Sequence, residues 1–124
     1  MKTLTKAEEQ VMQTLWKLKQ GGFLKDILES FPEPRPHSNT VATLLKILVE
    51  KGFVETEVQG RNNLYRFRVS KGEYGKKTMH QLVKGYFDGS PAKLVSQFVA
   101  YNKLSVEDLE TLLKEIRQSK NAHS

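Results

Sequence analysis

Apolar residues recur every three or four positions in two blocks at the start of the chain, a spacing typical of amphipathic helices. The first block follows Thr5 and Glu8, whose separation is that of a capping box, and we expect it to end at the glycine pair 21–22. The second block, residues 23–31, stops at the proline-rich segment 32–36, which disfavours helix. The pattern predicts two helices followed by a loop.

A third helical pattern comes next, and then the period changes. We expect Ser38 to be the N-cap of a helix that ends near Gly52. Apolar and polar residues then alternate over residues 54–59 and 65–69, as they do in strands with one face on a core. The polar residues 60–63 between these runs suit a turn, so this segment predicts a β-hairpin.

The rest of the chain returns to helical spacing, in three blocks that each begin with a serine. Ser70 and Glu73 have the spacing of another capping box. Ser90 precedes Pro91, which suits an N-cap with proline in the first helical position. Ser105 is the expected cap of the last block. The chain is therefore expected to end in three helices.

The order of elements predicts a mostly α protein with a small β-hairpin. Three helices and a hairpin describe a winged helix-turn-helix over residues 1–70. We expect residues 71–124 to form a three-helix dimerisation domain, because so short a segment buries little apolar surface alone. The bland alternative is that these helices fold back onto the winged helix. The candidates for a shared core are Tyr86, Phe87, Leu94, Phe98, Leu109, Leu112 and Ile116.

The third predicted helix carries a polar face opposite its apolar stripe. Asn39, Thr40, Thr43 and Lys46 occupy or border that face, where short polar groups can meet base edges and phosphates in the major groove of DNA. Asn39 suits adenine, and Lys46 suits guanine or phosphate. An ordinary solvated helix face would have the same pattern, so both interpretations remain open at this point.

The hairpin carries a local excess of positive charge. Between Val58 and Lys71 the sequence contains basic residues and no acid. Arg61 and Asn62 lie in the expected turn, where contact with the DNA backbone is easiest. The alternating rings of the second strand, Tyr65 and Phe67, could stack on bases, but alternation favours a core-facing position. The basic residues are Arg61, Arg66, Arg68 and Lys71.

Composition supports a soluble protein with an anionic partner. The chain has 124 residues, a formal net charge of +6 and a pI near 9.6, which favours association with nucleic acid. It lacks cysteine, which excludes disulfides and thiolate metal sites. No apolar stretch has the length of a signal peptide or a membrane span, so we expect a cytoplasmic protein without membrane insertion.

Residues for catalysis or for a cofactor are not brought together by any motif. The histidines His37, His80 and His123 are scattered, and no nucleophile set, paired carboxylates or glycine-rich phosphate loop accompanies them. We therefore expect no enzyme activity, no cofactor and no metal site. His37 is interpreted as a polar loop residue.

Three segments resemble the penicillinase repressor family, in its branch that responds to β-lactams. They are residues 4–8 (LTKAE), 40–46 (TVATLLK) and 51–54 (KGFV). Together with the hairpin, they extend the resemblance over nearly the whole chain. It implies a homodimeric repressor of a palindromic operator in double-stranded DNA, controlling a β-lactam-resistance or related stress-response operon. It also implies a membrane sensor whose signal leads to cleavage of the repressor by a protease.

The resemblance also indicates where relatives are cut and which switch this chain lacks. The family's scissile bond joins Asn to Phe in the first half of the dimerisation domain, and the matching positions here are Gln97 and Phe98. Gln97 thus departs from the family's residue. Copper-responsive relatives use a C-terminal cysteine cluster, which a chain without cysteine cannot supply.

Two other functions remain as alternatives. A winged helix can serve as a protein-interaction module without sequence-specific DNA binding, because fold alone does not establish function. RNA binding through the basic hairpin is another, although readout of single strands favours exposed aromatic rings over a face of Asn and Thr side chains. Binding to operator DNA that weakens with salt would distinguish the DNA-binding interpretation.

Overall fold

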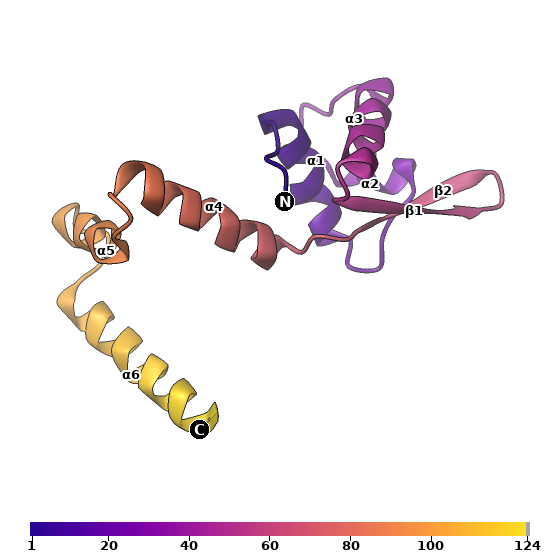
Figure 1. The fold of residues 1–124 in the computed structure, drawn as a ribbon. Coiled ribbons are helices and arrows are strands. Elements are labelled where there is room, and N and C mark those ends of the chain that lie inside the picture. The colour runs from indigo at the N-terminus through magenta and orange to yellow at the C-terminus, as the bar shows by residue number, and fades with distance from the viewer. Residues whose placement is uncertain (124) are drawn as a thin grey trace. The chain divides into compact units, whose positions relative to one another are not determined.

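The computed structural model describes the backbone of residues 1–123 and the side chains of residues 1–119, so His123 lies outside the described side chains. Its elements follow the predicted order of three helices, a hairpin and three helices (Figure 1). They are α1 (Lys6–Lys17), α2 (Leu24–Ser30), α3 (Ser38–Glu50), β1 (Val54–Gln59), β2 (Asn62–Phe67), α4 (Lys71–Tyr86), α5 (Pro91–Ala100) and α6 (Val106–His123). The expected fold class is thereby confirmed.

Local hydrogen bonds explain where most helices begin. The capping box of α1 is present in both directions: the Thr5 N–H donates to Glu8 Oε1 at 2.8 Å, and the Glu8 N–H donates to Thr5 Oγ1 at 3.2 Å. Ser70 and Glu73 form the equivalent pair before α4. Ser90 caps α5 by accepting from the Lys93 N–H. These predicted caps are confirmed.

The start of α3 differs from the expectation. Ser38 is the first helical residue, and the N-cap is His37, whose Nδ1 accepts a hydrogen bond from the Asn39 N–H at 3.2 Å. An imidazole nitrogen can satisfy an unpaired N–H of the first turn as a serine hydroxyl would. His37 is therefore a capping residue.

The hairpin is tighter than its sequence suggested. β1 and β2 pair antiparallel, with Gln59 opposite Asn62, so Gly60 and Arg61 alone form the turn. Asn62 and Asn63, expected in the turn, belong to β2. Gly60 has a φ of +65°, a conformation that glycine adopts without steric cost.

The loop after α1 pairs with β2 of the hairpin through a single antiparallel β-bridge. Gly22 and Tyr65 exchange two backbone hydrogen bonds, of 2.9 and 2.8 Å. The neighbouring Gly21 has a φ of +86°, and a Cβ there would lie 2.7 Å from the Tyr65 carbonyl oxygen. The glycine pair, expected only to stop α1, also permits this close approach.

Two compact units make up the chain, Met1–Lys76 and Lys77–Ser124. The division falls inside α4, whereas the predicted domain boundary at residue 70 coincides with the start of this helix. The first unit has a continuous apolar core, and Tyr65 and Phe67 pack against it, as alternation predicted. Its fully buried members are Val11, Met12, Leu15, Ile27, Val41, Leu45, Leu48, Phe53 and Val54.

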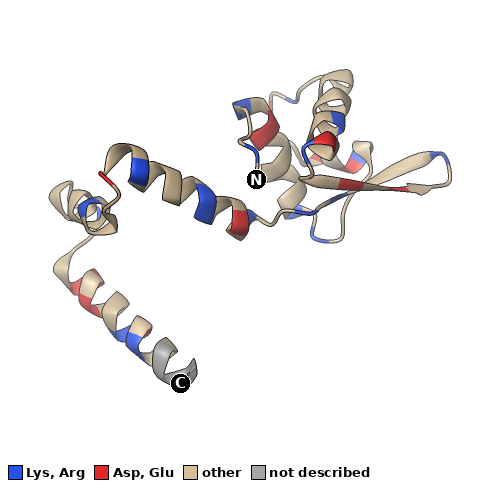
Figure 2. Ribbon diagram, in the orientation of Figure 1, with Lys and Arg blue, Asp and Glu red and all other residues tan. Residues whose placement is uncertain are grey.

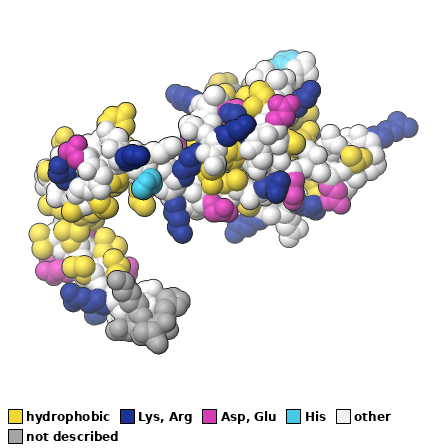
Figure 3. All heavy atoms as spheres, in the orientation of Figure 1, with side chains coloured by type: hydrophobic (Ala, Val, Ile, Leu, Met, Phe, Trp, Pro, Cys, Tyr) yellow, Lys and Arg dark blue, Asp and Glu magenta, His cyan; other side chains and the backbone are white. Residues whose placement is uncertain are grey.

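The second unit has little buried surface. Among its described side chains Val83 alone is buried, at 8% exposure. Figure 3 shows apolar side chains gathered on the surface over α5 and α6. None of the seven side chains expected in a shared core is buried: Phe87, Leu94 and Leu109 are half-buried, and Tyr86, Phe98, Leu112 and Ile116 are exposed.

Candidate nucleic-acid interface

α3 presents the polar face that its sequence predicts. Val41, Leu45 and Leu48 are fully buried and hold the helix on the core. The opposite side is open to solvent, because burying one apolar stripe of a helix leaves the other side free. Its exposed residues include the four predicted contact residues Asn39, Thr40, Thr43 and Lys46.

The hydroxyl of Thr43 is already engaged within the helix. Thr43 Oγ1 donates to the Asn39 carbonyl oxygen at 2.9 Å. This bond uses the only proton of the hydroxyl, so the groups that remain for an external partner are the oxygen lone pairs and the methyl group. Such a side chain can accept from a base edge or contact a thymine methyl group.

The hairpin places one cation at its tip and neutralises another along its length. Arg61 lies in the two-residue turn, and a cationic side chain projects from the end of the hairpin in Figure 3. Arg66 Nη1, in contrast, lies 2.6 Å from Glu57 Oε2 of β1. The segment between Val58 and Lys71 contains no acid, but Glu57 of the paired strand supplies a carboxylate to one of its arginines. Among the described side chains, Arg61 has no such ion pair.

Two hollows lie between the hairpin and the helices. One, of about 340 Å³, separates α3 from the hairpin, and its lining includes Lys46 and Asn63. The other, of about 440 Å³, lies between the start of α2 and the hairpin, and its lining includes Lys25, Arg61 and Asn62. Lys25 was not predicted as a contact residue, since it lies neither on the α3 face nor in the predicted turn, and Asn63 was predicted only as part of that turn. Figure 2 shows basic segments on α3 and at the hairpin tip.

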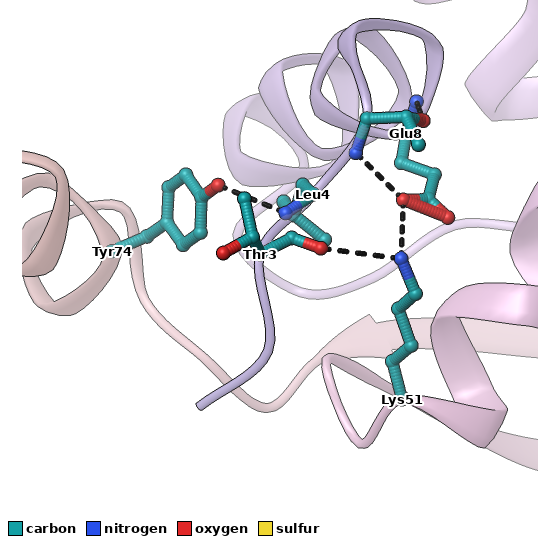
Figure 4. Close-up of polar contacts among 6 residues, drawn as sticks. Thr3, Leu4, Glu8, Lys51 and Tyr74 are labelled. Atoms are coloured by element: carbon teal, nitrogen blue, oxygen red, sulfur yellow. Dashed lines mark hydrogen bonds and ion pairs between the residues drawn. The ribbon is translucent and has the colours of Figure 1, made fainter.

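A buried ion pair supports the end of α3 (Figure 4). Lys51, its C-cap, lies with Nζ 2.6 Å from Glu8 Oε1, and Nζ also donates to the Thr3 carbonyl oxygen at 3.2 Å. Burial raises the pKa of Glu8, but hydrogen bonds from Lys51 and Thr5 and the charge of Lys51 outweigh burial and hold the pKa below its ordinary value of 4.5. Glu8 is therefore a structural carboxylate.

Two further features, metal-binding clusters and membrane-spanning helices, were sought in the part of the chain that is described. No group of three or more His, Asp or Glu side chains there could hold a metal ion. No helix among these residues is long and apolar enough to cross a membrane.

The helices α1, α2 and α3 and the hairpin form one unit, called here the head. Together with the polar face of α3, this head defines a winged helix-turn-helix protein of the DNA-binding class. A model of the penicillinase repressor family matches residues 4–118. The chain therefore belongs to the penicillinase repressor family and is a DNA-binding transcriptional repressor.

Individual relatives match over most of their length. The chain is 24% identical over 118 residues to the penicillinase repressor of Bacillus licheniformis, covering 95% of this chain and 92% of that protein. It is 27% identical over 110 residues to the methicillin resistance regulatory protein MecI of Mammaliicoccus sciuri, covering 88% and 89%. A solved structure of BpsR from Bordetella bronchiseptica aligns with a TM-score of 0.47 at 15% identity, covering 96% of this chain and 76% of that one.

Proposed function

We propose that this repressor is a cytoplasmic homodimer that binds a palindromic operator. The observation that carries the proposal is the exposed polar face of α3, with the cation Arg61, which has no ion pair among the described side chains, on the adjoining hairpin. A helix face of this kind fits the major groove, and a wing can reach the flanking backbone. Two such heads related by a two-fold axis would match a two-fold symmetric operator.

Each exposed side chain has a role in this arrangement. Asn39 pairs with adenine, Thr43 contacts a base through its methyl group and free lone pairs, and Lys46 reaches guanine or a phosphate. Thr40, at the start of α3, contacts the backbone. In the wing, Arg61 and Asn62 contact phosphates.

The apolar surface of the second unit supports dimerisation. Exposed apolar side chains on α5 and α6, including Phe98, Leu112 and Ile116, leave more apolar surface in water than a monomer commonly tolerates. An open hollow of about 400 Å³ between α4 and α5, with Val83, Leu94 and Val95 in its lining, offers room for apolar side chains of a second copy. Pairing would complete the core that one copy lacks.

Induction is proposed to proceed by cleavage between Gln97 and Phe98, by a protease acting downstream of a membrane sensor. This bond lies inside α5, where the Gln97 carbonyl accepts from the Tyr101 N–H at 3.0 Å. A protease must bind an extended segment, so the last turns of α5 would have to unwind before cleavage. Cutting there would separate α6 from the rest of the chain and so weaken the dimer. The regulated genes are proposed to be those of β-lactam resistance or a related stress response.

The test is selection of bound fragments from genomic DNA, followed by binding measurements at several salt concentrations. The proposal expects an enriched palindrome whose affinity falls as salt rises, because phosphate contacts release counterions. Enrichment of no common sequence would instead support the alternative of a protein-interaction module.

A further inference from the structure

The first turn of α4 is fastened to the winged helix by one aromatic side chain. Tyr74 is buried at 8% exposure. Its ring packs edge-on against Phe53, with centroids 5.7 Å apart, and at a tilt of 38° against Trp16, with centroids 6.2 Å apart. Ring pairs at these separations add directional attraction to their burial. Tyr74 therefore belongs to the core of the first unit, although it is part of α4.

The Tyr74 hydroxyl is also joined to the end of α3 through the N-terminal strap, defined here as Thr3 and Leu4 (Figure 4). The Leu4 N–H donates to Tyr74 Oη at 3.2 Å. One residue earlier, the Thr3 carbonyl accepts from Lys51 Nζ at 3.2 Å. Phe53, which meets the Tyr74 ring, lies two residues after Lys51. The start of α4 and the end of α3 are thus linked by two short routes.

The connection between β2 and α4 is held in the same place. Trp16 Nε1 donates to the Val69 carbonyl oxygen at 2.9 Å. Ser70 then caps α4 and accepts at its carbonyl oxygen from the Tyr74 N–H at 3.0 Å. A loop tied at both ends in this way has few conformations open to it. The residues around Tyr74 therefore fix the position of the first turn of α4 on the first unit, in addition to starting the helix.

We propose that Tyr74 is a positioning residue that determines which spacing of operator half-sites the repressor accepts. The inference rests on the proposed homodimer and palindrome. In a dimer joined through the second unit, α4 is the covalent path from the shared core to each α3. A fixed start of α4 would hold the two α3 helices at one separation, whereas a loose start would let each head adjust to its half-site.

The test compares the full-length protein with Tyr74→Leu on three synthetic duplexes made from the selected operator. They are the palindrome, the palindrome with one base pair inserted at its centre, and a single half-site. One base pair turns the half-sites by about 35° relative to each other. The wild type is expected to lose about tenfold in affinity on insertion, and Tyr74→Leu less than about threefold, with half-site affinity nearly unchanged.

Two further variants separate positioning from folding. Tyr74→Phe keeps the ring and removes only the hydroxyl, so its loss on insertion should lie between those of the wild type and Tyr74→Leu. Tyr101→Phe removes a hydroxyl from a tyrosine that is 72% exposed and should behave as the wild type. If Tyr74→Leu keeps the wild-type spacing preference, or loses half-site binding, the positioning role is wrong. If the wild type itself shows no spacing preference, the proposed dimer on a palindrome fails first.

Discussion

Lys51 and Glu8 form a 2.6 Å ion pair that joins the C-terminal end of α3 to the first turn of α1. The Glu8 side chain is 4% exposed and that of Lys51 is 22% exposed, so the pair is mostly shielded from water. Removing one partner of such a pair leaves a buried charge without compensation. The pair therefore holds α3, the helix with the candidate contact face, against the rest of the winged helix.

Replacement of Lys51 by methionine should lower the free energy of unfolding by about 2 kcal/mol at neutral pH, because Glu8 then stays buried without its cation. The measurement is chemical denaturation of the purified protein. Lys93→Met is the matched control, since Lys93 pairs with Asp88 at 2.9 Å on the surface and its loss should cost little. Equal losses for the two variants would contradict a structural role for the buried pair.

Acid should remove the stabilisation that the Glu8 carboxylate supplies. The pKa of Glu8 is lowered in the folded state, so its contribution is complete above the ordinary value of 4.5 and is lost as pH falls through the folded value. Glu8→Gln cannot titrate at this position. The difference in free energy of unfolding between wild type and Glu8→Gln should therefore shrink below pH 4.5. A difference that stays constant with pH would refute this linkage.

Thr43→Ala should weaken operator binding by about fivefold while leaving the melting temperature nearly unchanged, because the lost atoms face solvent in the free protein. The matched control is Thr111→Ala. Thr111 is also exposed, and its Oγ1 donates to the carbonyl oxygen four residues earlier at 3.0 Å, as Thr43 does at 2.9 Å. If operator affinity falls equally for both variants, the loss reflects the helix hydrogen bond and not a DNA contact.

Arg61→Ala should reduce the slope of log affinity against log salt by about 0.9, because one phosphate contact is lost, and should weaken specific and non-specific DNA alike. Arg66→Ala is the control on the same hairpin. Its guanidinium is paired with Glu57, so a smaller change of slope is expected. Equal slopes for wild type and Arg61→Ala would count against the wing contact.

The features that could be predicted from the sequence are those set by neighbours along the chain. The capping pair Thr5 and Glu8 acts over three residues, and the apolar stripe of α3 follows from helical periodicity. The position of Arg61 at the tip required only the change of period around it. These determinants are local, so a single sequence contains them.

The features that were missed depend on residues far apart in the chain. Lys51 and Glu8 are brought together by packing of α3 on α1, and the contact of Leu4 with Tyr74 joins the two ends of the first unit. The neutralisation of Arg66 depends on strand register, which places Arg66 opposite Glu55 and so brings its guanidinium within reach of Glu57, two residues further along β1. Periodicity gives the face of a residue but not its partner across the fold.

The apolar stripes of the second unit were predicted from the sequence, and most of their described side chains are exposed in the single chain. The measurement that tests the account most directly is sedimentation of the full-length protein at micromolar concentration, together with titration of duplexes carrying one or two half-sites. Leu112→Glu places a charge among the exposed apolar side chains of α6 and should dissociate the dimer. The account predicts a wild-type dimer that binds the palindrome about a hundredfold more tightly than one half-site, and loss of both properties in Leu112→Glu. A monomeric wild type, or equal affinity for one and two half-sites, would contradict it.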